Sequence, residues 1–103
     1  MKVRHETDLD PLLHQPVRTR IAAYLVTRGE VTFTELKQAL AVTDGNLEAH
    51  LKKLTGAHYV SVMKNGHQGR VLTSYQLTAE GLTAFKNYVT SLKNLLPMQN
   101  AKL

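Results

Sequence analysis

The side chains of this sequence that are best suited to chemistry are hydrogen-bond donors and cations between positions 43 and 70. Asn46 carries an amide that can make two hydrogen bonds to adenine in a major groove, and His50, one helical turn later, can donate to guanine. Gly45 has no side chain, so a ligand could approach the backbone closely there. The candidate contact residues are Thr43, Asp44, Gly45, Asn46, Ala49, His50, Lys52, Lys53, Lys64, His67 and Arg70.

The sequence does not indicate a catalytic site. The chain has no cysteine, its five histidines are scattered, and it has neither a glycine-rich phosphate loop nor a carboxylate pair with an evident role. We therefore expect no enzyme activity and no cofactor. Because thiolates are absent, a soft-metal site is excluded. A histidine and carboxylate site between subunits, using His5, Glu6, Asp8 or His14, is kept as an alternative.

The charge of the chain indicates an anionic partner. Its 103 residues carry a formal net charge of +5, and after position 43 seven basic residues stand against three acidic ones. A basic surface concentrates polyanions, so nucleic acid and an acidic membrane are the first partners to consider. No segment approaches the ~20 apolar residues of a membrane span, and the N-terminus lacks the apolar stretch of a signal peptide. We therefore expect a cytoplasmic protein without a membrane partner.

The elements that must position these side chains begin with a helix. An apolar stripe predicts a helix from Pro16 to Arg28, which a glycine ends. Arg18 and Arg20 on this helix are expected to pair with Glu30 or Glu35 rather than with phosphates. Three leucines upstream predict a short helical lead-in that packs on this domain or on a second copy; they are Leu9, Leu12 and Leu13.

Two further helices follow. Residues 31–33 are β-prone and Thr34 offers a hydroxyl cap, so we expect a short strand and then a short helix. Thr43 is the expected N-cap of the next helix, over about 43–55. Leucines at positions 47, 51 and 54 form the buried seam of that helix, which turns its polar residues outward.

The rest of the chain predicts a hairpin and a long helix. Residues 59–63 and 71–77 have the composition of strands, and the polar segment between them, about 64–71, predicts an exposed basic tip. Thr78 is the expected cap of a final helix over about 78–96, which Pro97 ends. Its apolar seam runs over roughly 28 Å, longer than this small domain can easily cover, so we expect a second subunit to cover it. The expected dimer interface comprises Leu9, Leu12, Leu13, Leu82, Phe85, Val89, Leu92 and Leu96.

This order of elements is that of a winged helix-turn-helix. The predicted fold is α+β and mostly helical, with a three-helix core, a β-hairpin wing and a long C-terminal helix. Residues 42–54 (VTDGNLEAHLKKL) resemble the recognition-helix signature of small prokaryotic winged helix-turn-helix transcriptional regulators related to the MarR and ArsR groups, and residues 14–18 (HQPVR) and 75–81 (YQLTAEG) are similar to two further segments of them. Ala41 and His58 stand where these families commonly have glycine, and His58 is expected to adopt a left-handed conformation.

The resemblance implies a single domain over residues 1–103, with a core of about 9–78 and a dimerisation helix of about 78–96. The implied function is sequence-specific binding of double-stranded DNA, at a pseudo-palindromic operator, by a homodimeric transcriptional regulator whose effector is unknown. A protein-interaction module and a metal-responsive regulator are the alternatives.

The resemblance also implies how the parts would divide the work. The helix at about 43–55 would lie in the major groove, and the wing at about 64–71 would lie on the backbone or in the minor groove. Lys52 and Lys53 are as well placed for phosphates as for solvent. Arg70 is the favoured wing contact. Asp44, in the first turn of its helix, is expected to complement the helix dipole.

Overall fold

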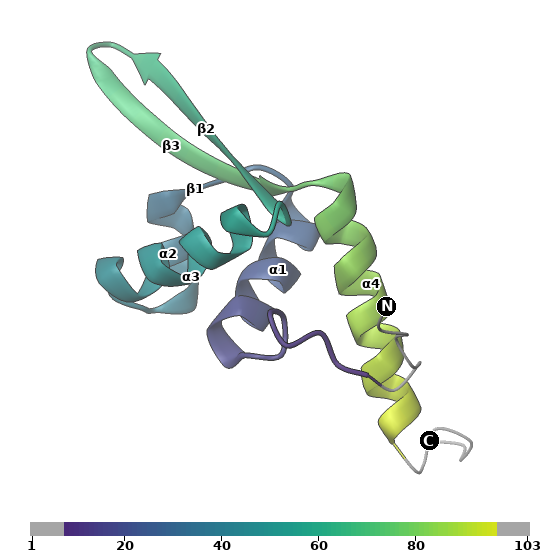
Figure 1. Ribbon diagram of the computed structural model, residues 1–103. Coiled ribbons are helices and arrows are strands. Elements are labelled where there is room, and N and C mark those ends of the chain that lie inside the picture. The colour runs from purple at the N-terminus through teal and green to yellow at the C-terminus, as the bar shows by residue number, and fades with distance from the viewer. Residues whose placement is uncertain (1–7, 97–103) are drawn as a thin grey trace.

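A computed structural model describes residues 8–96 of the chain (Figure 1). Within this range the helices are α1 (Pro16–Arg28), α2 (Phe33–Leu40), α3 (Asp44–Gly56) and α4 (Ala79–Leu95), and the strands are β1 (Val31–Thr32), β2 (Val60–His67) and β3 (Arg70–Leu77). The order confirms the predicted winged helix-turn-helix. In Figure 1 the β2–β3 hairpin projects from the helical body, and α4 leaves from the base of the hairpin.

Side-chain caps explain where the first two helices begin. The Gln15 side chain accepts a hydrogen bond from the Arg18 backbone N–H, and Gly29, at φ 83°, ends α1 as predicted. The predicted cap of α2 was wrong: Thr32 Oγ1, rather than Thr34, accepts from the Glu35 backbone N–H at 3.1 Å. Both threonines can cap, but β1 ends at Thr32, whose extended backbone suits an N-cap.

The turn that leads into α3 has the geometry the sequence predicts. Thr43 Oγ1 accepts from the Asn46 backbone N–H at 3.2 Å, which confirms Thr43 as the N-cap. Ala41, before it, is left-handed at φ 55°. His58, after α3, has φ 63°, so the left-handed conformation expected there is confirmed. Ala41 and His58 thus have a backbone conformation in which glycine would be less strained.

The wing is longer than the sequence predicts. Strands β2 and β3 pair antiparallel from Val60 opposite Leu77 to His67 opposite Arg70, and β3 also pairs with β1. The turn consists of Gln68 and Gly69, whose φ values of 51° and 77° are those of a two-residue hairpin turn of type I′. The polar residues expected in the loop therefore continue the ladder, because backbone pairing does not require apolar side chains.

The hydrophobic core lies between the three N-terminal helices, the root of the hairpin and α4. It contains Leu13, Ile21, Ala22, Leu25, Val31, Leu36, Leu40, Leu47, Leu51, Leu54, Val60 and Tyr88. The lead-in is a turn rather than the expected short helix, because the buried Asp10 accepts from the Leu12 backbone N–H and from Tyr59 Oη and so fixes it in a non-helical path. Leu13 is only 1% exposed within one chain, so its assignment to a dimer interface was wrong.

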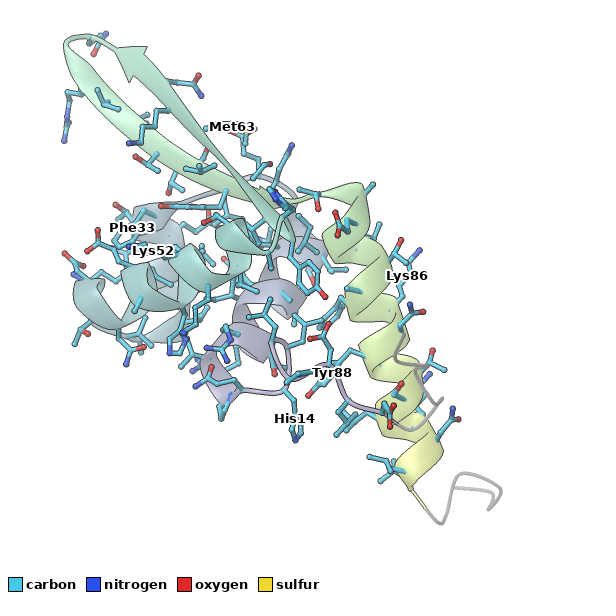
Figure 2. The ribbon with its side chains drawn as sticks, viewed as in Figure 1. His14, Phe33, Lys52, Met63, Lys86 and Tyr88 are labelled. Atoms are coloured by element: carbon cyan, nitrogen blue, oxygen red, sulfur yellow. The ribbon has the colours of Figure 1, made fainter. Side chains whose placement is uncertain are left out.

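Helix α4 turns a different face to the core than its apolar seam suggests. Its buried residues are Gly81, Tyr88 and Ser91, and Figure 2 shows Tyr88 beside His14, whose Nδ1 lies 2.9 Å from Tyr88 Oη. Phe85, Leu9 and Leu12 are partly buried and pack against the core. The helix ends at Leu95, one residue before the predicted boundary, and Pro97 lies outside the described residues.

Candidate nucleic-acid interface

Helix α3 presents a solvent-exposed face that contains several of the predicted contact residues. Leu47, Leu51 and Leu54 are buried, and side chains three or four positions apart share a helix face. The opposite side of the helix is therefore formed by Gly45, Ala49 and Lys52, all exposed. Asn46, His50 and Lys53 form the flank next to this face; Asn46 and Lys53 are exposed and His50 is half-buried. We call these six residues the outer face of α3.

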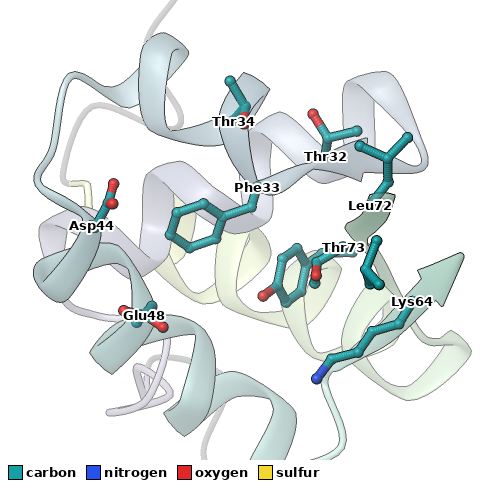
Figure 3. Close-up of a pocket in the computed structure, with 10 residues that line it drawn as sticks. Thr32, Phe33, Thr34, Asp44, Glu48, Lys64, Leu72 and Thr73 are labelled. Atoms are coloured by element: carbon teal, nitrogen blue, oxygen red, sulfur yellow. The ribbon is translucent and has the colours of Figure 1, made fainter. Parts of the chain in front are cut away.

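The acidic residues of α3 lie on the other flank, toward the hairpin. Asp44 and Glu48 line a hollow of about 490 Å³ between α3, the start of α2 and the wing, together with Phe33 and Lys64 (Figure 3). The first residue of α3 is Asp44, and its Oδ1 lies 2.8 Å from Lys37 Nζ. A carboxylate in the first turn stabilises a helix, so its position agrees with the dipole role. The outer face itself carries no carboxylate.

Arg18 and Arg20 of α1 do not make the ion pairs with Glu30 or Glu35 that the sequence predicts. Arg18 donates from Nε to the Leu12 carbonyl at 2.6 Å, and Arg20 donates from Nη2 to the Leu40 carbonyl at 3.0 Å. The two glutamates instead bond to other residues. Glu35 accepts from Arg28 and Tyr24, and Glu30 accepts from Ser74. The prediction was wrong because Tyr24 and Arg28, one helical turn apart, hold Glu35, while backbone carbonyls hold the guanidinium groups of Arg18 and Arg20.

Arg18 instead reaches the predicted contact residue His50. Its Nη1 lies 3.0 Å from His50 Nδ1, joining α1 to the middle of α3. Burial, followed by the positive charges of Arg18 and Lys53, lowers the pKa of His50 below its ordinary value. The imidazole is therefore neutral at neutral pH. Sequence reasoning considered Arg18 for phosphates or glutamates but missed its contact with His50, which lies 32 positions away.

The wing holds the remaining predicted contacts. Lys64 lies in the middle of β2, not at the tip, opposite Thr73 on β3. Arg70 begins β3 and is exposed, as is its neighbour Val71, at 68%. His67 ends β2 opposite Arg70 in the ladder. The structure thus places the two wing cations several residues apart along the hairpin, with only Arg70 next to the turn.

Between residues 8 and 96 no group of three or more histidine, cysteine or acidic side chains is arranged to hold a metal ion. Among the residues of the metal alternative, His14 bonds to Tyr88, and His5 and Glu6 lie outside the described residues. The helices described between residues 8 and 96 include none that is long and apolar enough to cross a membrane.

Comparison with known proteins assigns the arrangement to a family. Residues 17–96 match the family model of a winged helix DNA-binding domain. An uncharacterised protein from Methanocaldococcus jannaschii is 40% identical over 84 residues, which make up 82% of this chain and 91% of that protein.

Two solved structures have folds similar to that of this chain. A transcriptional regulator homologue from Pyrococcus horikoshii is 28% identical to this chain, with a TM-score of 0.80 over 89% of each chain. A possible transcriptional regulator for arsenical resistance has a TM-score of 0.65 over 95% of this chain and 92% of its own. Its identity is 22%, so that likeness concerns the fold alone.

Proposed function

The chain belongs to the winged helix DNA-binding domain family, and from that premise we propose that it binds double-stranded DNA sequence-specifically, as a homodimeric transcriptional regulator. The observation that carries the proposal is the outer face of α3, where amide, imidazole and lysine side chains surround Gly45 and Ala49 without a carboxylate. Base edges are read by such donors, and phosphates are bound by such cations.

The division of labour along α3 follows from helix-turn-helix docking. The N-terminal part of the second helix of this motif reaches base edges. Asn46 lies in that part and is exposed, so we assign it the reading of adenine. Thr43 and Asp44 come before it and belong to the start of the helix, where the backbone approaches the groove. Lys52 lies further along the helix, on the outer face, where phosphate contacts are expected.

The wing supplies a second contact. Arg70, exposed next to the turn, is assigned to the backbone or to the minor groove, where a narrow groove attracts arginine. Lys64, further from the tip, lies on the side of the hairpin that faces the hollow beside α3, so we assign it a supporting electrostatic role. His67 remains a predicted tip contact.

Helix α4 supports the proposed homodimer. Its core-facing residues leave Leu82 exposed at 36%, Leu92 at 39% and Leu96 at 50%. These side chains and the half-buried Phe85 and Val89 follow one another at spacings of three and four, the repeat by which two helices pack. A twofold dimer would present two copies of α3 to successive major grooves, so we expect a pseudo-palindromic operator with half-sites about one helical turn, ~34–36 Å, apart.

Selection of bound sequences from random duplex DNA tests the function. We expect an enriched pseudo-palindrome and binding that weakens steeply with salt, because each neutralised phosphate contributes about −0.9 to the log–log slope. Arg70→Ala is expected to weaken binding to all DNA sequences and to flatten the salt slope by about one. Asn46→Ala is expected to relax the preference for particular bases. Lys86→Ala, an exposed lysine of α4, is the charge-matched control and should change neither. Absence of duplex binding by the wild type at low salt would refute the proposal.

Sedimentation of a seam variant tests the dimer. Val89→Asp combined with Leu92→Asp places two charges in the proposed seam, where burying unpaired charge is strongly unfavourable, so we expect a monomer. Thr83→Asp combined with Thr90→Asp adds the same charge to exposed polar positions of the same helix and should leave the dimer intact. A dimer that survives the seam substitutions would show that the interface lies elsewhere.

A further inference from the structure

Arg18 links the lead-in to the outer face of α3. Its side chain donates from Nε to the Leu12 carbonyl at 2.6 Å, and its Nη1 lies 3.0 Å from His50 Nδ1. The backbone N–H of the same residue donates to the cap residue Gln15 at 2.9 Å. The guanidinium is thus held at two of its nitrogens, on one side by a backbone carbonyl and on the other by the imidazole.

The chemistry of the two groups determines where the imidazole carries its proton. A guanidinium has five N–H donors, no acceptor, and remains charged in proteins. The contact with His50 Nδ1 can therefore be a hydrogen bond only if Nδ1 is the acceptor. A neutral imidazole whose Nδ1 accepts must carry its hydrogen on Nε2. The lowered pKa of His50 agrees with this neutral form.

The position of His50 on α3 makes its Nε2–H group available to a ligand. His50 shares a flank of α3 with the exposed Asn46 and Lys53, and its own side chain is half-buried rather than enclosed. With Nδ1 engaged by Arg18, the nitrogen left for a ligand is Nε2, a single donor that cannot accept. In a major groove, guanine presents two acceptors, O6 and N7, whereas cytosine presents an N4 donor.

We infer that Arg18 is a positioning residue that holds His50 as an Nε2–H donor for an acceptor on a guanine edge, and that the pair disfavours cytosine at that position. The inference rests on the proposed function, since it concerns how the same α3 surface reads DNA. Arg18 itself acts through His50 and makes no contact with the base.

Nuclear magnetic resonance of histidine labelled with nitrogen-15 tests the first half of the inference in the free protein. We expect the Nε2–H tautomer for His50 in the wild type and a mixture of tautomers in Arg18→Met, which keeps the aliphatic stem but removes every donor. Arg20→Met is the matched control, because Arg20 lies on the same helix and its side chain donates to the Leu40 carbonyl rather than to His50. An Nδ1–H tautomer in the wild type, or no change in Arg18→Met, overturns the inference.

Binding to the selected duplex tests the second half. Arg18→Met and His50→Ala are each expected to lose about tenfold of the preference for guanine over cytosine, the effect of one net hydrogen bond, and the double variant no more than either. The salt slope should stay unchanged. Arg18→Lys keeps the charge but has one donor nitrogen in place of three, so it should lose the same preference. If the Arg18 variants bind all DNA sequences equally more weakly and with a shallower salt slope, Arg18 is a phosphate contact and the inference is overturned.

The two experiments separate this inference from the proposed function. If the wild type binds no duplex, the proposed function fails and the reading role fails with it, whatever the tautomer. If the wild type binds a selected duplex but Arg18→Met and His50→Ala retain the guanine preference, DNA binding stands and the role of this pair is refuted.

Discussion

Alanine at two helical glycines is expected to change stability in opposite directions. Gly81, in the first turn of α4, lies so close to Tyr59 that an added Cβ would stand 2.0 Å from the Tyr59 carbonyl oxygen. Ordinary carbon–oxygen contacts begin at about 3.3 Å, so the helix or the root of the wing would have to move by more than about 1 Å. Gly45, in the first turn of α3, has open space at the same position.

The magnitude follows from three contributions. Alanine in place of glycine favours a helix by at most about 1 kcal/mol. Overpacking at Gly81 costs about 1–3 kcal/mol, and the carbonyl that would be displaced accepts from the Thr78 backbone N–H at 3.0 Å, a hydrogen bond worth about 1 kcal/mol. We therefore expect Gly81→Ala to lower the free energy of unfolding by about 1–3 kcal/mol. Gly45→Ala should raise it by up to about 1 kcal/mol.

The free energy of unfolding and the Tm of both variants can be measured by chemical and thermal denaturation. For a domain of this size each kcal/mol corresponds to a change in Tm of about 4–8 °C. Gly45→Ala serves as the control, because it makes the same chemical change without the steric conflict. It should also weaken DNA binding, since a methyl group is added to the outer face of α3, where we propose that the DNA approaches the backbone closely. A Gly81→Ala protein as stable as the wild type would refute the close packing of α4 on Tyr59.

Three further variants test individual contacts. Leu13→Ala should lower the free energy of unfolding by about 2–5 kcal/mol in denaturant titration, because the side chain is 1% exposed; a loss below about 1 kcal/mol would contradict its place in the core. Tyr59→Phe removes the 2.6 Å hydrogen bond to the buried Asp10 and should cost about 1–3 kcal/mol, and an unchanged Tm would show that the carboxylate finds another partner. Burial, Arg18 and Lys53 lower the pKa of His50, so His50 binds a proton more readily in the unfolded chain than in the folded one. The free energy of unfolding should therefore fall as the pH decreases below the ordinary histidine value of about 6.5. His50→Gln should flatten that pH dependence, and an equally steep profile in the variant would show that other groups cause it.

Features that depend on neighbours within one or two helical turns could be predicted from the sequence. The bounds of α1, the cap at Thr43 and the cap at Thr78 agree with the structure, because a hydroxyl three residues before an N–H forms its bond locally. The left-handed conformation of His58 could also be expected, since a turn geometry is a property of a few successive residues.

The sequence-based predictions were wrong where two residues could cap the same helix and where strand pairing could continue into a predicted loop. Thr32 and Thr34 can both cap a helix, and pairing of Val31 and Thr32 with β3 decided between them. The polar residues near Lys64 suit a loop as well as a strand, and only the partner strand lengthens β2 to His67. In both cases the competing conformations have similar local energies, so a contact distant in sequence selects one of them.

The sequence by itself determined the order of elements, the outward polar face of α3 and the basic character of the chain, because each follows from local periodicity or composition. Only the tertiary structure decided that Leu13 lies in the core, that α4 turns Tyr88 inward and leaves Leu92 exposed, and that Arg18 meets a histidine 32 positions away. The physical reason is the same for all three. Which partner a side chain meets depends on how helices cross, and periodicity along one helix contains no information about the rotation of its neighbour.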